Sequence, residues 1–190
     1  FQLDYVGGTY GFHVRPANYH KVECIGWDRL LDGMSMAYRF VTEDQVRAGG
    51  LAGAQMLVLP AVQALPPDVA EAVRQFAAAG GIVVATSAPA LYGDDMQAKP
   101  PGQLADVFGA DFREFLGRSV VAETPLGTPR REGWIHPWSP NPAKASAASD
   151  SLRTLFAAFA PREGADVLAR YTSGQPAVVR NAFGKGQAVV

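Results

Sequence analysis

The residue best placed to carry out chemistry is Ser87, which opens the loop Ser87-Ala88-Pro89 directly after an apolar run. Folds built on a parallel sheet place their reactive groups in such loops. A serine nucleophile also needs a base and an oxyanion hole at fixed positions. None of the three histidines has a spacing that pairs it with Ser87, and Pro89 removes one backbone donor from the loop. The histidines are His13, His20 and His136. We therefore interpret Ser87 as a turn residue and expect no catalytic residue in the chain.

A second candidate lies in a proline-rich excursion at residues 124–149, where arginine, histidine and tryptophan side chains cluster. The residues are Arg130, Arg131, Trp134, His136 and Trp138. Indole faces suit sugar rings and guanidinium groups suit carboxylates, so the cluster could contact a carbohydrate. Exposed tryptophans are also unfavourable in water, so the same rings could instead cover this domain's core or an interface. Both interpretations stay open at this point.

Three further side chains, Tyr92, Asp94 and Asp95, fall at the expected carboxyl end of the sheet. They could border a ligand cleft or belong to an ordinary solvated loop. Cys24 falls on an expected helix, and we interpret it as a half-buried structural thiol. A single cysteine with scattered histidines has no spacing typical of a metal site. Gly184-Lys185-Gly186 lacks the spacing of a phosphate-binding loop, so we expect neither a metal nor a cofactor.

Length and composition narrow the class of protein. The chain has 190 residues, 48% of them hydrophobic and 18% charged, which is enough for the core of one domain. A formal net charge of −1 gives no global field that would favour nucleic acid or an anionic membrane. No apolar run reaches transmembrane length. Both ends look cut, so we expect one domain over 1–190 that belongs to a longer multidomain chain. The compartment stays unknown, with the cytoplasm slightly favoured.

The elements that must position these residues are clearest between residues 56 and 85. Met56–Leu59 is a continuous apolar run, which is typical of a strand buried on both faces of a parallel sheet. Pro66-Pro67 suits the first turn of a helix, and Gly80-Gly81 suits its end. Ile82–Ala85 is the next apolar run. The pattern predicts a strand, a helix and a strand joined by a right-handed parallel crossover.

The remaining elements are predicted from capping residues, turns and short apolar runs. Residues 1–17 are expected to form a loop extension. Helices are expected at 18–32, after a capping box at 42–45, at 103–108 and at 152–159. Strands are expected at 38–41, 111–115, 119–123, 166–171, 176–181 and 187–190. The last three strands follow one another with short turns, which predicts an antiparallel extension of the sheet.

Four stretches together resemble a known family. They are LVLPAVQALPPDVAEAVRQFAAAGGIVVAT, the loop SAPALYGDD, the helix phrase LADVFG and the ending GQPAVVRNAFGKGQAVV. The chain resembles, over roughly residues 18–125 and 164–190, the β-galactosidase trimerisation domain of family-42-type glycoside hydrolases, which has a class I glutamine-amidotransferase-like fold. Such domains follow a catalytic barrel in the same chain and are typically non-catalytic. Here the amidotransferase nucleophile, a cysteine, is absent, and Ser87 or Ala88 falls near its place.

The pattern and the resemblance together imply an α/β fold. We expect a three-layer α/β/α, flavodoxin-like or class I glutamine-amidotransferase-like domain, with a mainly parallel sheet and an antiparallel C-terminal extension. The expected function is a non-catalytic accessory and oligomerisation domain of a carbohydrate-active enzyme of the β-galactosidase type. Its partners would be the catalytic barrel of the same chain, further copies of itself (a trimer among the options) and a carbohydrate. The alternatives are a sugar- or polyol-binding or sensor domain, and a cryptic hydrolase or amidotransferase that uses Ser87.

Overall fold

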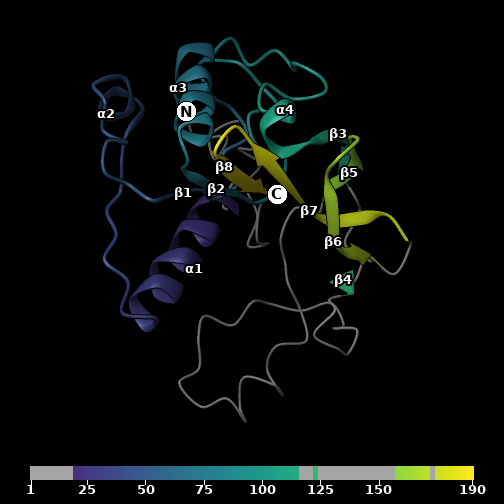
Figure 1. The fold of residues 1–190 in the computed structure, drawn as a ribbon, viewed down its shortest axis with the longest axis horizontal. Coiled ribbons are helices and arrows are strands. Elements are labelled where there is room, and N and C mark those ends of the chain that lie inside the picture. Colours follow the sequence, from purple (N-terminus) through teal and green to yellow (C-terminus); the bar gives the residue numbers. More distant parts are fainter. Residues whose placement is uncertain (1–18, 116–121, 124–156, 172–173) are drawn as a thin grey trace, which may run out of the picture.

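The computed structural model describes residues 19–115, 122–123, 157–171 and 174–190. Its centre is a six-stranded sheet in the order β1-β2-β8-β7-β6-β4 (Figure 1). The strands are β1 (Met56–Leu59), β2 (Ile82–Ala85), β4 (Ala122–Glu123), β6 (Asp166–Tyr171), β7 (Pro176–Phe183) and β8 (Gly186–Val189). β1, β2 and β8 run parallel, whereas the pairings of β8 with β7, β7 with β6 and β6 with β4 are antiparallel.

The β1-α3-β2 unit forms as the sequence predicts. Helix α3 (Pro67–Ala78) places a proline at its first position, where the missing N–H has no intrahelical partner. Its buried side chains are Val69, Ala70, Val73 and Ala77, a stripe with helical spacing. After the helix Gly80 takes a φ of +121°, a conformation that glycine adopts without strain. The stripe on α3 belongs to the main core, together with Leu57 and Leu59 of β1 and Val83 of β2.

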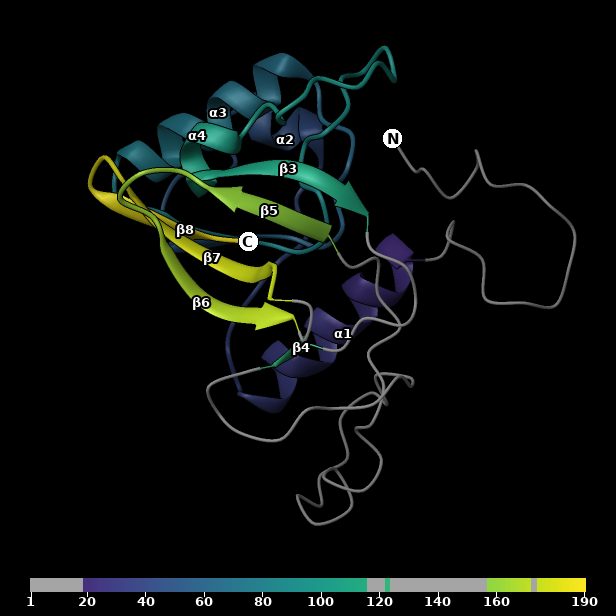
Figure 2. The ribbon, with the colours of Figure 1, turned by 90° about the vertical axis from the view of Figure 1, so that its right-hand side faces the viewer.

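A second, two-stranded sheet pairs β3 (Ala110–Phe115) with β5 (Ala157–Pro161) in antiparallel register (Figure 2). It follows the short helix α4 (Ala105–Phe108). The expectation of a helix at 152–159 is wrong for its described part, because Ala157, Ala158 and Phe159 are buried in β5. Alanine favours helix locally, but pairing with a strand more than forty residues earlier decides the outcome here.

The first part of the described chain contains α1 (Tyr19–Gly33) and α2 (Glu43–Arg47). α2 begins with the expected capping box, in which Thr42 Oγ1 accepts from Gln45 N and Gln45 Oε1 accepts from Thr42 N. The expectation of a strand at 38–41 is wrong, because these residues belong to no strand in the structure. A run with strand-like composition becomes a strand only when a neighbouring strand pairs with it.

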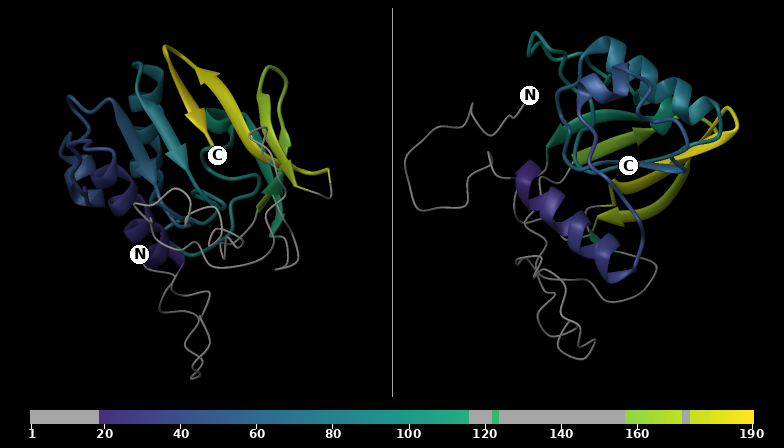
Figure 3. Two further views of the ribbon diagram at one scale, coloured as in Figure 1. Left: turned by 90° about the horizontal axis from the view of Figure 1, so that it is seen from below. Right: turned by 90° about the vertical axis from the view of Figure 1, so that its left-hand side faces the viewer.

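The architecture is therefore a mixed α/β fold with a core made mostly of sheet. Among the described strands of the large sheet, two pairings are parallel and three are antiparallel, so the sheet is mixed rather than mainly parallel. The antiparallel C-terminal extension is confirmed. α3 and α1 lie on opposite sides of β1 and β2 (Figures 1 and 3). No helix in the described part of the chain has the length and apolar character needed to cross a membrane.

Candidate functional site

Ser87 lies two residues beyond the carboxyl end of β2, at a sharp turn of the chain. Its φ is +64°, in the left-handed region that non-glycine residues rarely adopt. Its Oγ accepts a hydrogen bond from the Gln63 side-chain amide, with Nε2 and Oγ 3.1 Å apart. An amide cannot take up the hydroxyl proton, so this contact orients Ser87 without activating it. The geometry fits a hydrogen-bonded turn serine in a strained turn.

Gln63 connects Ser87 to Tyr92, although the sequence alone did not single it out. Its carbonyl oxygen accepts from Tyr92 N at 2.9 Å while its side chain donates to Ser87. The Tyr92 carbonyl oxygen in turn accepts from Leu65 N at 3.0 Å and from the Gln103 side chain at 2.9 Å. The backbone hydrogen bonds of Tyr92 thus join the loop that follows β1 to the loop that follows β2.

A polar junction fixes the first half of α1 to the carboxyl ends of β1 and β2. The His20 ring nitrogen Nδ1 lies 2.7 Å from the Pro60 carbonyl oxygen, and because a carbonyl only accepts, Nδ1 is the donor. The Thr86 hydroxyl accepts from Ala61 N at 2.9 Å and donates to the Glu23 carboxylate at 3.2 Å. The junction therefore orients α1 through directional bonds as well as apolar packing.

Cys24 lies one helical turn after His20, as the sequence placed it, and is half-buried. Its Sγ is 3.6 Å from His20 Nε2. Since Nδ1 donates to Pro60, Nε2 is the ring nitrogen left to face the thiol. Within residues 19–115, 122–123, 157–171 and 174–190, no group of three or more histidine, cysteine or acidic side chains could hold a metal ion.

The other sequence candidates separate into two groups. Asp94 is exposed, and Asp95 accepts from Gln97 N at 2.9 Å and pairs with Lys99 at 2.8 Å. The hydrogen bond from Lys99 holds the pKa of Asp95 below its usual value. The second group lies outside the described residues. It consists of Arg130, Arg131, Trp134, His136 and Trp138.

A large hollow of the described chain lies elsewhere, beside β1. It is a cleft of about 1260 Å³ whose walls come from α1, residues 36–44, residues 50–55, β1, residues 60–65, the buried side of α3 and the start of β2. Trp27 and Leu31 of α1 line it, as do His20 and Cys24, whereas Ser87, Tyr92 and Asp94 do not. No sequence motif marks this cleft, although the alternation of large apolar side chains at Met36, Tyr38 and Phe40 is a usable signal.

Comparison with known families identifies the chain. Residues 34–190 match the family described as β-galactosidase trimerisation domain. The chain belongs to this family. The match includes β1, α3, β2 and the last strands β6, β7 and β8, so the resemblance seen in the sequence is confirmed. A search of curated proteins found no match.

Solved structures of similar fold come from β-galactosidases. This trimerisation domain aligns with Gan42B, a GH42 β-galactosidase from G. stearothermophilus, with a TM-score of 0.68, 17% identity and coverage of 97% of this chain and 25% of that one. The β-galactosidase from Rahnella sp. R3 gives a TM-score of 0.68 and 22% identity over 97% of this chain and 26% of that one. The enzyme from Bacillus circulans sp. alkalophilus gives 0.61 and 22%, over 90% and 24%. The trimerisation domain thus spans about a quarter of each relative, and these identities show the shared fold alone.

Proposed function

We propose that this chain is a non-catalytic accessory and oligomerisation domain of a larger glycoside hydrolase of the β-galactosidase type. The observation that carries the proposal is the family match over residues 34–190, in a chain that spans about a quarter of the similar β-galactosidases. A catalytic barrel in the same polypeptide and further copies of the domain would be its partners. The domain 1–190 would then be one unit of a multidomain protein.

The described carboxylates support a non-catalytic role. Glycoside hydrolysis uses two carboxyl groups that face the scissile bond from about 5 to 9.5 Å apart, one of them as acid. Six aspartates of the described chain instead pair with a basic side chain. The pairs are Asp44 and Asp68 with Arg47, Asp95 with Lys99, Asp106 with Arg74, Asp111 with Arg162, and Asp166 with Arg180. Hydrogen bonds from the basic partners lower the pKa of Asp68, Asp95 and Asp106, which suits these carboxyl groups poorly to the role of the acid.

The finer fold assignment, a three-layer α/β/α flavodoxin-like domain, is part of the same proposal. It is supported by the parallel order β1-β2-β8 and by α1 and α3 on opposite sides of those strands. The composition of β1 supports it further. Among the described strands β1 lies at the edge of the sheet, but its continuous apolar sequence is typical of strands that are buried in the interior of a parallel sheet, as in a three-layer domain. An experimental structure of the parent enzyme would test it.

The oligomerisation role can be tested on the parent enzyme by cross-linking between subunits. Subunits grown in light and heavy nitrogen are mixed, and an amine-reactive reagent joins lysines on neighbouring chains. Three exposed lysines, Lys21, Lys99 and Lys185, report on different parts of the domain. We expect an oligomer by light scattering and mixed-isotope cross-links that include at least one of these lysines. A monomeric parent, or an oligomer with cross-links confined to other domains, would refute the proposal.

The alternative of a sugar- or polyol-binding domain has one supporting observation, the cleft beside β1. Trp27, Tyr38 and Glu43 line it, and aromatic faces with a nearby carboxylate suit a sugar ring. Titration of the parent enzyme with galactose and with glycerol, followed by tryptophan fluorescence, tests this alternative. A saturable change that disappears in Trp27→Phe would favour it, whereas the same response in both proteins would exclude binding at this cleft.

A further inference from the structure

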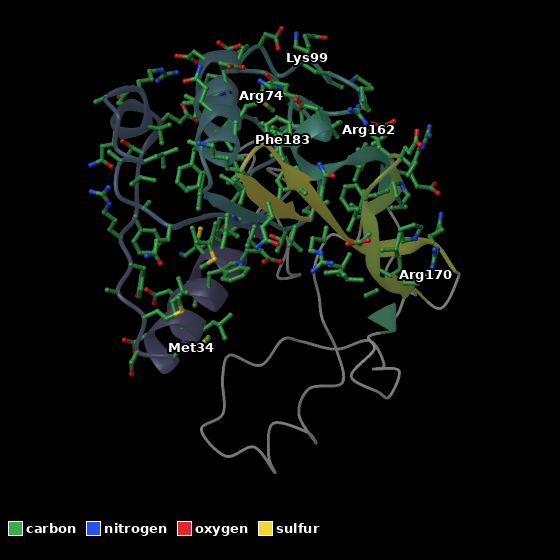
Figure 4. All side chains as sticks on the ribbon, in the orientation of Figure 1. Met34, Arg74, Lys99, Arg162, Arg170 and Phe183 are labelled. Atoms are coloured by element: carbon green, nitrogen blue, oxygen red, sulfur yellow. The ribbon has the colours of Figure 1, made fainter. Side chains whose placement is uncertain are left out.

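The cleft beside β1 lies between two segments of strand-like sequence. One is β1 itself, and the other is residues 36–41, which we call the outer segment. Met34, labelled in Figure 4, marks the end of α1 from which the outer segment runs back toward α2. Large apolar side chains alternate along it at Met36, Tyr38 and Phe40, and all three line the cleft. A period of two is typical of a strand, yet no described strand pairs with the outer segment.

β1 has an edge without a strand partner among the described residues. The carbonyl oxygens of Gln55 and Leu59 accept hydrogen bonds from β2 at 2.9 and 3.3 Å. Because the backbone groups of a strand alternate between its two edges, those of Met56 and Val58 point away from β2. No described strand lies on that side, although the continuous apolar sequence of β1 is typical of a strand in the interior of a sheet. Such an edge is a template for a further strand.

The other walls of the cleft come from helices on both faces of the sheet. Trp27 and Leu31 line it from α1, and Val69 and Val73 line it from α3. α1 and α3 lie on opposite sides of β1 and β2 (Figure 3). The hollow therefore lies in the layer of the sheet itself, with a helix above it and a helix below it. This is the position of one strand between β1 and the outer segment.

The size of the cleft favours a strand over a small ligand. Its volume of about 1260 Å³ exceeds the roughly 300–1,000 Å³ of typical small-molecule pockets. Protein interiors are close-packed, so a hollow of this size that reaches core side chains such as Leu65 and Val73 calls for a large apolar occupant. A segment that pairs along the four residues of β1 would extend about 13 Å, at about 3.3 Å per residue.

Hydrogen bonds to other elements hold the outer segment in place. The Tyr38 hydroxyl donates to the Asp28 carboxylate on α1. Arg39 Nη2 donates to the Gly50 carbonyl oxygen, after α2, at 2.5 Å. The two sides of the cleft are thus positioned before anything enters it, so an entering strand would order little besides itself.

The rest of this chain offers no segment of the required type. A strand buried on both faces of a parallel sheet is a near-continuous apolar run. The described residues already hold their own positions in the fold. In the other stretches of the sequence the longest apolar run has two residues; these stretches are 1–18, 116–121, 124–156 and 172–173.

We propose that a strand from elsewhere in the parent polypeptide, outside residues 1–190, inserts between β1 and the outer segment and pairs with both. The occupant is an extended apolar segment of about four to six residues that runs parallel to β1, as β2 and β8 do. The inference rests on the proposed function only in requiring that this chain be part of a larger polypeptide. Insertion would place β1 in the interior of the sheet and make residues 38–41 a strand.

Hydrogen exchange in the wild-type parent enzyme tests the pairing. The amides of Met56 and Val58 point into the cleft, whereas those of Leu57 and Leu59 point toward β2 and serve as internal controls. We expect all four amides to exchange within about tenfold of one another, because a strand that is paired on both edges opens as one unit. Exchange of Met56 and Val58 that is faster than this would show an unpaired edge and overturn the inference.

Photo-cross-linking in the parent enzyme identifies the occupant. p-Benzoylphenylalanine is placed at Phe40, which lines the cleft, and in a matched control at Leu168, an exposed apolar side chain on β6. Subunits grown in light and heavy nitrogen are mixed, so that cross-links within one chain differ in mass from those between chains. We expect position 40 to cross-link within one chain to an apolar segment outside residues 1–190, and position 168 not to reach that segment.

The remaining outcomes overturn the inference. Cross-links from position 40 that stay within residues 1–190 would show that this chain fills the cleft itself, and cross-links between subunits would show that another copy covers it. The absence of any cross-link from position 40 would also overturn it. Protection of Met56 and Val58 that appears only with added galactose would assign the cleft to a sugar.

The inference can fail without the accessory role failing. An intact mass that corresponds to these 190 residues alone would refute both, whereas the outcomes above would refute only the added strand. If the variant at position 40 does not fold, the exchange of Met56 and Val58 in the wild-type enzyme decides.

Discussion

A pair of substitutions at Ser87 tests whether the turn after β2 is strained and whether it contributes to catalysis. Ser87→Ala removes the hydroxyl that accepts the Gln63 hydrogen bond but keeps a side chain at a φ of +64°. Ser87→Gly removes the same hydroxyl and the Cβ that makes this φ unfavourable. The difference between the two variants therefore isolates the backbone strain from the lost hydrogen bond.

The expected magnitudes follow from the two contributions. A half-buried neutral hydrogen bond contributes about 1 kcal/mol, and a left-handed non-glycine residue costs roughly 1–2 kcal/mol. Ser87→Ala should therefore lower the local opening free energy by about 1 kcal/mol. In Ser87→Gly the relief of strain should offset the lost bond, so the net change should be within about 1 kcal/mol of zero.

Native-state hydrogen exchange with mass spectrometry measures these changes without requiring the multidomain parent to unfold in one step. The reporters are the amides of Ala90 and Tyr92, which donate to the carbonyl oxygens of Val62 and Gln63. A loss of about 1 kcal/mol corresponds to roughly fivefold faster exchange in Ser87→Ala. Turnover of the parent enzyme, measured in parallel, should be unchanged in both variants.

Ser35 offers a matched control, because it is exposed and also left-handed, with a φ of +55°. Ser35→Gly should slow exchange of the neighbouring Met36 amide by about fivefold through strain relief alone. Equal destabilisation by Ser87→Gly and Ser87→Ala would refute the strain argument. A thousandfold loss of turnover in Ser87→Ala, the scale for a removed catalytic group, would refute the non-catalytic role.

Two further predictions concern the scaffold. Gly109→Ala should destabilise the fold by about 2–3 kcal/mol, because the φ of Gly109 is +60° and a Cβ there would lie 2.6 Å from Asn181 Cγ. Gly164→Ala is the control, since Gly164 has a φ of +85° but open space around it, and this change should cost only about 1 kcal/mol. Thermal unfolding measures both. Burial raises the pKa of Tyr171 to about 12, whereas the value in the unfolded chain is about 10. The contribution of the protonated Tyr171 side chain to stability is therefore fully present below a pH of about 10 and is lost as the pH rises through 12. Tyr171→Phe should remove this loss of stability at alkaline pH. Near neutral pH it should cost about 1 kcal/mol, since the Tyr171 hydroxyl donates to the Ala157 carbonyl oxygen at 2.9 Å. An unchanged alkaline melting profile would contradict the assignment of the alkaline loss to Tyr171.

The parts of the fold that the sequence predicted correctly have local causes. The bounds of β1 and β2 agree with the structure, because each is a short apolar run that proline or glycine interrupts nearby. α2 was identifiable from the capping box at Thr42, and the two sides of that box lie only three residues apart. The last strands were identifiable because tight turns separate them, although β7 extends two residues further than the expected 176–181.

The candidate site was only partly predictable, because its contacts join distant parts of the chain. Ser87 and Tyr92 stood out by their position in a loop after a strand. Gln63, which bonds to both, is an ordinary glutamine in the sequence and becomes notable only when β1 and β2 lie side by side. The Thr86–Glu23 bond spans 63 positions and could not be read from any local pattern.

The sequence by itself determined the local elements, the strand–helix–strand unit and the family, since these depend on neighbouring residues and on the order of motifs. The tertiary structure decided which runs found strand partners. Residues 157–159 became a strand because β3 lies beside them, and residues 38–41 did not because no described strand does. It also decided that β8 inserts between β2 and β7 and that Met36, Tyr38 and Phe40 remain exposed beside a cleft. Hydrogen bonding between strands and burial of side chains are properties of the assembled chain, because both depend on which distant residues come into contact.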